Sequence, residues 1–350
     1  MKTPAALGFA MPAEWEPHAR TLVAWPCRGT LWGSAERMSR ARAAYAEVAR
    51  AIAAFEPVMM LVHPDDAKEA ERLCGKDVEI VPLPIDDSWV RDTGPIFVAR
   101  GPAGGREVAG TDWRFNGWGG KYVPHADDDK IPERLLTAWR IPRFEAPMVL
   151  EGGSITVDGE GTLYTTEECL LAQNRNPELS RADIEASLKD QLGVSHIVWL
   201  PWGIDDDETD GHIDNVAALA GPSRLLLNWT TEKDDPNYKR MRANEAALAK
   251  QRDARGRHID VIEMPQPLKQ LAWNGARLPL SYLNFYVCNG AVIAPRFDDP
   301  LDLDAKRILA AAFPEREIVQ VNALDIVPGG GGIHCITQQM PAGVAAKVDG

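Results

Sequence analysis

The residue whose type and setting most clearly offer chemistry is Cys335, which follows a run of four glycines at 329–332. Consecutive glycines allow backbone conformations closed to other residues and let another group approach closely. A Pro-Gly turn, the glycines and a short apolar segment therefore predict a loop that delivers a thiol onto a strand. Such a thiol is a candidate nucleophile, but a buried structural cysteine in the last strand would give the same local pattern.

His212 and Asp214 form a second candidate site, because they are two residues apart and follow the turn signal Asp-Gly at 210–211. On a strand this spacing places both side chains on one face, whereas on a helix they would diverge. An imidazole and a carboxylate on one face could serve as a general acid and base. The alternative is a solvated acidic loop, since residues 205–208 are all acidic.

Two further carboxylates precede turn signals. Asp92 comes just before Gly-Pro at 94–95, so we expect it at the end of an extended segment, with Trp89 as a wall of an apolar slot. A turn cap is the local alternative for Asp92. Glu151 precedes Gly-Gly and could bind a ligand or be a plain turn residue.

Two other residues near these motifs have competing interpretations. Trp118 lies in an aromatic–glycine loop at 112–120, which suits a flat or cationic ligand, although buried tryptophans more often belong to the core. His334 adjoins Cys335, but neighbours on a strand point to opposite faces. We therefore predict that His334 is not the partner of the thiol and that a distant histidine such as His212 is.

Composition narrows the class of protein. The chain has 350 residues, of which 45% are hydrophobic and 25% charged, as in an ordinary soluble globular protein. The net charge of −13 argues against nucleic acid and anionic membranes as partners and weakly favours a cationic small substrate, although solubility alone would explain it. No apolar run is long enough for a membrane span, and the first residues do not read as a signal peptide.

The cysteines indicate the compartment. There are five, widely spaced and without a Cys-x-x-Cys pair. This argues against a disulfide framework and a zinc site, and for a reducing environment, so we expect a cytoplasmic protein. The sequence also offers no metal-ligand spacing and no phosphate-binding loop, and we expect neither a metal nor another cofactor.

The elements that must position these residues alternate between helix and strand. Helices are predicted at 34–55, at 183–192 with Ser180 as N-cap, at 236–255 and at 303–313. Short apolar runs at 58–62, 196–200, 225–227 and 291–294 predict buried strands. The alternation indicates an α/β fold.

The polar motifs recur at long, similar intervals. The steps from Asp92 to Glu151, His212, Asn284 and Cys335 are 59, 61, 72 and 51 residues. Five modules of about 70 residues would use the whole chain, and a long period of this kind suggests a propeller-like array. The modules share almost no sequence identity, so the spacing is the only sign of a repeat.

Taken together, eight collinear segments resemble those of the agmatine deiminases, within the guanidino-group-modifying superfamily that also holds bacterial peptidylarginine deiminases. The segments are MPAEWEPH (11–18), WP (25–26), DSWVRDTGP (87–95), FNGWGG (115–120), EGGS (151–154), TDGHID (209–214), SYLNF (281–285) and GGGIHCITQQ (330–339). One position departs from the pattern, since such sequences usually carry asparagine where this chain has Gly332. The change removes a polar side chain and should loosen the loop.

The resemblance implies a fold and a set of roles. The fold is a five-bladed, pseudo-symmetric α/β propeller of ββαβ modules around a central active-site channel, with residues 1–350 as one catalytic domain. The roles implied are a nucleophile, a general acid/base and two guanidinium-binding carboxylates, namely Cys335, His212, Asp92 and Asp214. The residues expected to line the substrate pocket are Trp89, Trp118, Glu151, Asn284 and Gly331.

The resemblance also implies a reaction. Agmatine and water would give N-carbamoylputrescine and ammonia through an amidino-cysteine intermediate, without a cofactor. A deiminase of free or peptide-terminal arginine is the nearest alternative, and a non-catalytic protein that binds polyamine-like cations is a third. Relatives form homo-oligomers, so a homodimer or a larger homo-oligomer is expected.

Overall fold

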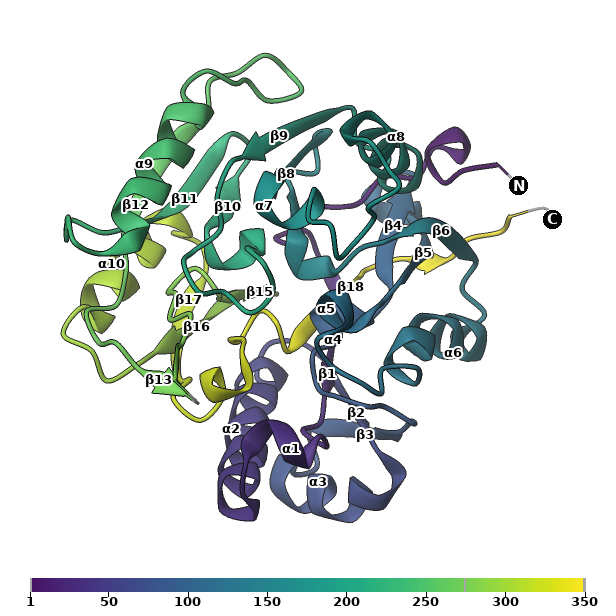
Figure 1. Ribbon diagram of the computed structural model, residues 1–350. Coiled ribbons are helices and arrows are strands. Elements are labelled where there is room, and N and C mark those ends of the chain that lie inside the picture. The colour runs from purple at the N-terminus through teal and green to yellow at the C-terminus, as the bar shows by residue number, and fades with distance from the viewer. Residues whose placement is uncertain (1, 274, 349–350) are drawn as a thin grey trace.

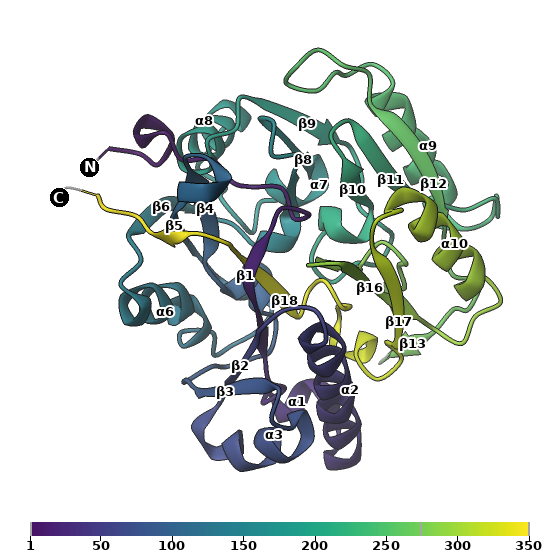
Figure 2. The same ribbon diagram turned by 180° about the vertical axis from the view of Figure 1, so that it is seen from behind.

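The computed structural model describes residues 2–273 and 275–348, and it is a mixed α/β structure, as the sequence predicts. Within those residues there are five sheets of three or four strands and one small hairpin, formed by β13 (Ala272–Trp273) and β14 (Ala276–Arg277). In both views the long helices lie at the rim of the molecule (Figures 1 and 2). Apart from the small hairpin, the sheets lie inside this rim of helices.

Each of the five sheets contains the same unit, in which an antiparallel pair of strands is followed by a helix and a strand parallel to the second. The first unit consists of β18 (Thr337–Pro341), β1 (His18–Ala24), α2 (Ala35–Ala53) and β2 (Val58–Val62), and the second of β4 (Ile96–Arg100), β5 (Glu107–Arg114), α6 (Ile131–Trp139) and β6 (Arg143–Val149). The third unit consists of β7 (Ile155–Val157), β8 (Thr162–Thr166), α8 (Arg181–Leu192) and β9 (His196–Leu200), and the fourth of β10 (Ala217–Gly221), β11 (Arg224–Trp229), α9 (Pro236–Leu248) and β12 (Asp260–Pro265). The fifth unit consists of β15 (Tyr286–Cys288), β16 (Ala291–Arg296), α10 (Asp302–Ala312) and β17 (Glu317–Asn322). Two sheets are extended, the first by α3 (Ala67–Cys74) and β3 (Val78–Pro82), the second by β19 (Val344–Ala345).

The first sheet joins the two ends of the chain. Strand β18, near the C-terminus, pairs with β1, so that Val23 lies opposite Thr337. On its other side β1 pairs with β2, whose five residues are all buried and apolar. A strand covered on both faces needs such a continuous apolar run, which is why residues 58–62 could be predicted as a strand.

Local sequence explains the best-defined helix. At the start of α8, the Ser180 hydroxyl accepts a hydrogen bond from the backbone of Asp183, whose side chain accepts one from the Ser180 backbone. This reciprocal pair satisfies amide groups that a helix start leaves free. Gly193 ends the helix with φ 64°, a left-handed conformation in which glycine has no steric penalty.

Several short elements lie between the sheets, and three of them carry residues of the candidate site, with Asp92 in α4, Trp118 in α5 and Asp214 in η6. These short elements are the helices α1 (Gly29–Trp32), α4 (Val90–Thr93), α5 (Gly117–Gly120) and α7 (Glu167–Leu170), and the 3₁₀ turns η5 (Gly152–Ser154), η6 (Ile213–Asn215) and η7 (Val327–Gly329). Four other 3₁₀ turns lie elsewhere, η1 (Ala5–Leu7), η2 (Pro64–Asp66), η3 (Ala103–Gly105) and η4 (Asp128–Lys130). Helix α4 and strand β18 lie near the middle of the molecule in Figure 1.

Most of the predicted elements are confirmed, and four local predictions are wrong. The helix predicted at 236–255 ends at Leu248. Asp92 lies in the short helix α4 and not in an extended segment. His212 is the N-cap of η6 and Asp214 lies within it, so the two residues do not share a strand face. Cys335 lies in a turn at 333–336, just before β18, and not on a strand. Turns between sheets replace the expected strands because their polar side chains bind one another instead of alternating across a sheet.

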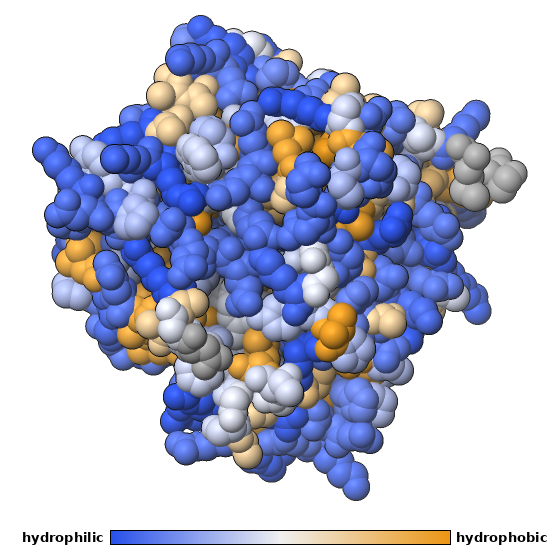
Figure 3. Space-filling model, in the orientation of Figure 1, coloured by the Kyte–Doolittle hydropathy of each residue, from blue (hydrophilic) through white to orange (hydrophobic). Residues whose placement is uncertain are grey.

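The surface and the interior differ as expected for this composition. Buried apolar side chains form five clusters within the described residues. The face seen in Figure 3 is mostly hydrophilic, with apolar residues in small scattered groups. None of the helices in the described part of the chain combines the length and the apolar character needed to cross a bilayer.

Candidate active site

The thiol of Cys335 is buried between two polar groups from other modules. Its Sγ atom lies 3.5 Å from Asp214 Oδ2 and 3.2 Å from Asn284 Nδ2. The turn that carries it is held against α4, since the backbone N–H of Arg91 donates to the carbonyl of Cys335 at 3.2 Å and the Arg91 side chain donates to Gln339 at 2.8 Å. Arg91 is itself buried, so this contact fixes the position of the thiol within the fold.

His212, Asp92 and Asp214 converge on one small space next to η5. A methyl group added to Gly153 would lie 2.6 Å from His212 Nδ1, 2.8 Å from Asp92 Oδ1 and 3.0 Å from Asp214 Oδ2. Asp92 Oδ1 is also 3.8 Å from His212 Nδ1. Three residues that the sequence placed in one site are therefore together, and Gly153 leaves the space that they share. The sequence showed Gly153 only as part of a turn.

Asp92 is held in place by two hydrogen bonds. Trp118 Nε1 donates to Asp92 Oδ2 at 2.9 Å, and the backbone N–H of Gly153 donates to Asp92 Oδ1 at 2.8 Å. Trp118 adopts a left-handed backbone conformation (φ 52°) between glycines, which turns its indole toward the carboxylate. The aromatic–glycine loop thus positions a site residue, in addition to any contact with a ligand.

Glu151 lies on the other side of His212. Its Oε1 accepts a hydrogen bond from Arg175 Nε at 2.6 Å, and its Oε2 lies 4.0 Å from His212 Nε2. Both members of the Glu151–Arg175 pair are buried. The ligand atoms of Glu151, Cys169 and His212 lie within 4.8 Å of one another, close enough for a metal ion to bridge, but an ion there would occupy the imidazole.

His334 was missed by the sequence analysis as a member of this site. Its Nδ1 lies 2.9 Å from Asp214 Oδ2 and its Nε2 lies 2.8 Å from Glu14 Oε2, which in turn is 3.8 Å from Arg91 Nη2. The argument that excluded it assumed a strand, whereas residues 333–336 form a turn. Within the described residues no hydrogen bond joins His334 to the sulfur, but it orients the carboxylate that faces the sulfur.

The pKa values of Asp92 and Asp214 shift in opposite directions. Burial raises the pKa of Asp92 and outweighs the effect of His212, while Asp214 and Glu151 add to the rise. Burial works in the same direction at Asp214, but the hydrogen bond and charge of His334, together with His212, lower its pKa below the usual value. Asp214 is therefore the more firmly ionised of the two.

His212 is surrounded by groups that favour its protonated form. Burial disfavours the imidazolium of His212, yet Asp92, Cys169 and Glu151 raise its pKa well above the usual value. In the described residues neither ring nitrogen of His212 has a hydrogen-bond partner. A protonated imidazole with free N–H groups can donate a proton to a bound molecule.

A narrow pocket of about 20 Å³ opens directly onto the sulfur, with room for about one water molecule. It is lined by Asp87, Trp89, Asp92, Trp118, Tyr122, Glu208, Thr209, Gly329, Gly330, Gly331 and Cys335. Of the five residues expected to line a substrate pocket, Trp89, Trp118 and Gly331 belong to this set. Glu151 and Asn284 do not line the pocket, although Asn284 contacts the sulfur.

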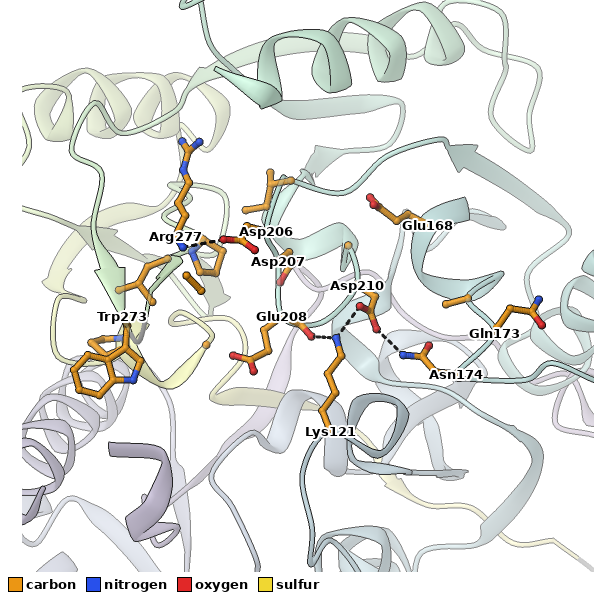
Figure 4. A pocket seen from close by; sticks show the side chains of 18 residues that line it. Lys121, Glu168, Gln173, Asn174, Asp206, Asp207, Glu208, Asp210, Trp273 and Arg277 are labelled. Carbon is orange, nitrogen blue, oxygen red and sulfur yellow. Dashed lines mark hydrogen bonds and ion pairs between the residues drawn. The ribbon is translucent and has the colours of Figure 1, made fainter. Parts of the chain in front are cut away.

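A second, larger cavity of about 690 Å³ adjoins the first and shares Glu208 and Gly330 with it. Its acidic lining residues are Glu168, Asp206, Asp207, Glu208 and Asp210, against the cationic Lys121 and Arg277. Figure 4 shows these side chains around the opening, with the Lys121 side chain hydrogen-bonded to Asp210 and the backbone N–H of Arg277 donating to Asp206. The route to the sulfur therefore carries an excess of negative charge.

Comparison with known proteins gives consistent matches over nearly the whole chain. The family model for the Porphyromonas-type peptidyl-arginine deiminases matches residues 10–341. The agmatine deiminase of Pseudomonas aeruginosa (strain LESB58) is 47% identical over 363 aligned positions, which cover 97% of each chain.

Two solved structures share the fold. The agmatine deiminase of Enterococcus faecalis is 35% identical with a TM-score of 0.93, and the match covers 97% of this chain and 98% of that one. A cysteine-to-serine variant of the C. jejuni agmatine deiminase with substrate bound is 26% identical with a TM-score of 0.86, covering 96% and 97%. The chain belongs to the Porphyromonas-type peptidyl-arginine deiminase family.

Proposed function

We propose that this member of the family hydrolyses agmatine to N-carbamoylputrescine and ammonia through a covalent amidino-cysteine. The observation that carries the proposal is the arrangement of Cys335, whose sulfur faces a carboxylate at 3.5 Å. That carboxylate and a second one border the same small space as an unpartnered imidazole. A thiol, a proton donor and two anions around one space are what a planar guanidinium requires.

In the proposed complex, Asp92 and Asp214 bind the guanidinium by paired hydrogen bonds and hold its carbon in front of the sulfur. Carboxylates are the geometric complement of a guanidinium, because each can accept two parallel N–H groups. The bound cation also replaces the water that now fits the pocket. Fixing the reacting atoms at contact distance removes a large part of the entropic barrier.

The bound cation supplies the charge that ionises the thiol. Burial, followed by Asp214 and Asp92, raises the pKa of Cys335 well above the usual value. A guanidinium between the same two carboxylates offsets their effect on the sulfur, so the thiolate forms as the substrate binds. The free enzyme keeps a protonated and less reactive thiol.

The first chemical step forms a C–S bond. The thiolate of Cys335 attacks the guanidinium carbon, and the electron pair of one C–N double bond moves onto nitrogen. His212 gives its proton to an –NH₂ nitrogen, the C–N bond breaks and ammonia leaves. The product of this step is an amidino-thioether.

The second step hydrolyses the thioether. His212, now neutral, takes a proton from a water molecule that adds to the same carbon. The C–S bond breaks, the thiolate returns, the remaining hydroxyl proton passes to solvent and the neutral ureido product leaves. The raised pKa of His212 favours the protonated form that the first step requires.

The far end of the pocket favours an amine over a carboxylate. Among the residues that line the narrow pocket there is no lysine or arginine, whereas Glu208 lies at its mouth and accepts a hydrogen bond from Tyr122. The ammonium of agmatine would pair with Glu208, while the α-carboxylate of arginine would be repelled. Because the pocket is so small, the Tyr122–Glu208 contact must open as the substrate enters.

The second candidate is deimination of free or peptide-terminal arginine. It is favoured by one observation, the match of residues 10–341 to a family model described by peptidyl-arginine deiminases. The charge around the narrow pocket favours agmatine instead.

The experiment is a ureido-product assay with agmatine, arginine and an arginine-terminated peptide in parallel, using the wild type and Cys335→Ala. We expect product from agmatine with the wild type and none with the variant. Product from arginine alone would favour the second candidate. Tight agmatine binding without any product would indicate a non-catalytic cation-binding protein.

We further propose that the five repeated units form a five-bladed, pseudo-symmetric propeller around the site and that residues 1–350 act as a single catalytic domain. The common ββαβ topology and the five apolar clusters support this arrangement. We also propose a cytoplasmic homodimer or larger homo-oligomer. Sedimentation would measure the assembly, and fractionation the location.

A further inference from the structure

Asn284 has a fixed orientation that determines what it presents to the sulfur. Its Oδ1 lies 2.9 Å from the backbone N–H of His334 and 3.4 Å from that of Cys335. Both partners are donors only, so they require the oxygen of the amide on that side. The opposite orientation would set an NH₂ group against two N–H groups.

The amide nitrogen must then face the nucleophile. Asn284 Nδ2 lies 3.2 Å from Cys335 Sγ and 3.0 Å from Asn215 Oδ1, whereas Asn284 Oδ1 lies 3.5 Å from the same sulfur. The nitrogen is therefore the amide atom nearer to the sulfur. One N–H of the group goes to the Asn215 oxygen and the other to the sulfur, so both donors are used. A donor at this distance stabilises a thiolate more than a thiol, because hydrogen bonds to charged groups are stronger.

The backbone of Gly332 lies directly against this amide. A methyl group at Gly332 would lie 2.5 Å from Asn284 Oδ1, 2.9 Å from its Cγ and 3.1 Å from its Cβ. The backbone of Gly332 has no left-handed φ, so alanine is conformationally allowed there and the obstacle is Asn284 itself. The sequence analysis expected Gly332 to loosen the nucleophile loop. In the structure, the side chain of Asn284, from another module, fills the space beside Gly332.

We propose that Asn284 is a positioning residue that holds the nucleophile turn through its oxygen and stabilises the Cys335 thiolate through its nitrogen. The proposal rests on the proposed role of Cys335 as nucleophile. It changes the expected role of Asn284, from a residue that lines the substrate pocket to one that acts on the sulfur.

The first test measures the thiolate directly, by the pH dependence of Cys335 alkylation with iodoacetamide in the absence of agmatine. In Asn284→Ala the apparent pKa of alkylation should rise by about one unit or more, because one hydrogen bond to a charged group is lost. Asn284→Asp, which keeps the acceptor but places a second anion near the sulfur, should raise it further. An unchanged pKa in both variants would refute the proposal.

The control for a merely structural effect is Ser281→Ala. Ser281 lies in the same segment, and its hydroxyl donates to the carbonyl of Asn215 at 2.9 Å, without touching the sulfur. We expect this variant to lose thermal stability but to keep the wild-type alkylation pKa. A pKa shift as large as that of Asn284→Ala would mean that loosening the segment is sufficient, against the proposal.

The second test is a double-mutant cycle on agmatine turnover. Gly332→Ala and Asn284→Ala should each lower kcat by about tenfold or more, whereas the double variant should be no worse than Asn284→Ala alone, because the methyl group then occupies vacated space. Additive losses would mean that the methyl group at 332 does not act through Asn284. Absence of turnover in the wild type would refute the proposed function but leave the alkylation test valid.

Discussion

At the scale of single residues, the site depends on glycines as much as on reactive groups. The side chains of His212, Asp92 and Asp214 meet at the position where Gly153 lacks one. Similarly, a methyl group at Gly331 would lie 2.6 Å from the Trp89 ring and 3.1 Å from the sulfur. A side chain at either position would collide with residues of the candidate site.

Gly153→Ala tests this dependence. The added methyl would press on three polar atoms at 2.6–3.0 Å, and we expect kcat/KM for agmatine to fall by about 100-fold or more, the usual result of small displacements in an active site. Gly29→Ala is the matched control, because a methyl there meets nothing within 4 Å. Steady-state kinetics and a thermal melt of both variants provide the measurement. Near wild-type activity in Gly153→Ala would contradict the geometry.

At the scale of elements, the site is carried by turns and one-turn helices that long-range contacts hold in place. Helix α4 and the turn at 333–336 bind each other through Arg91, and the N-terminal segment reaches the same turn through Glu14 and His334. Isolated elements of this length are not stable by themselves. Their conformation therefore depends on these buried polar contacts.

Glu14→Gln tests the link from the N-terminal segment. Burial raises the pKa of Glu14, but His334 and Arg91 outweigh it and lower the pKa to about 2, below the value of 4.5 expected for the unfolded chain. The ionised carboxylate thus stabilises the fold above pH 4.5, and this contribution is lost as the pH falls towards 2. We expect the variant to be less stable than the wild type by about 2–3 kcal/mol near pH 6.

Urea unfolding followed by tryptophan fluorescence at pH 6 and pH 3 provides the measurement, and the difference between the two proteins should shrink at pH 3. Glu36→Gln, at an exposed carboxylate of α2, is the control and should show no such difference. An equal loss of stability at both pH values would mean that the charge of Glu14 has no role.

At the scale of the whole molecule, acidic residues gather around the larger cavity that adjoins the narrow pocket. The protein carries a net charge of −13, and the cavity of about 690 Å³ in front of the narrow pocket is lined mainly by acids among its charged residues. A cleft with one sign of charge raises the local concentration of oppositely charged ligands. We therefore expect the acidic residues around the cavity to attract a cationic substrate towards the narrow pocket.

Ionic strength tests this effect. Raising the salt concentration from about 0.05 to 0.5 M should lower kcat/KM for agmatine several-fold with little change in kcat, because salt screens the attraction. The neutral reagent iodoacetamide is the control, and its rate of reaction with Cys335 should change much less. Equal salt effects on both reactions would indicate a general effect on the protein.

The sequence by itself determined the α/β class and most helices and strands, and its resemblance to a known family pointed to the four residues proposed for the chemistry. Periodicity and capping signals are local, so α8 and β2 could be located from residues within them. The order of the motifs, each at a module boundary, indicated that distant residues would share one site.

Only the tertiary structure decided how the polar side chains in the turns are oriented. His334 reaches Glu14, 320 residues away, and Asn284 reaches Cys335, 51 residues away. A turn has no repeating side-chain direction, so its sequence does not show which way a side chain points. That direction is set by partners from other modules, and it makes His334 and Asn284 part of the site.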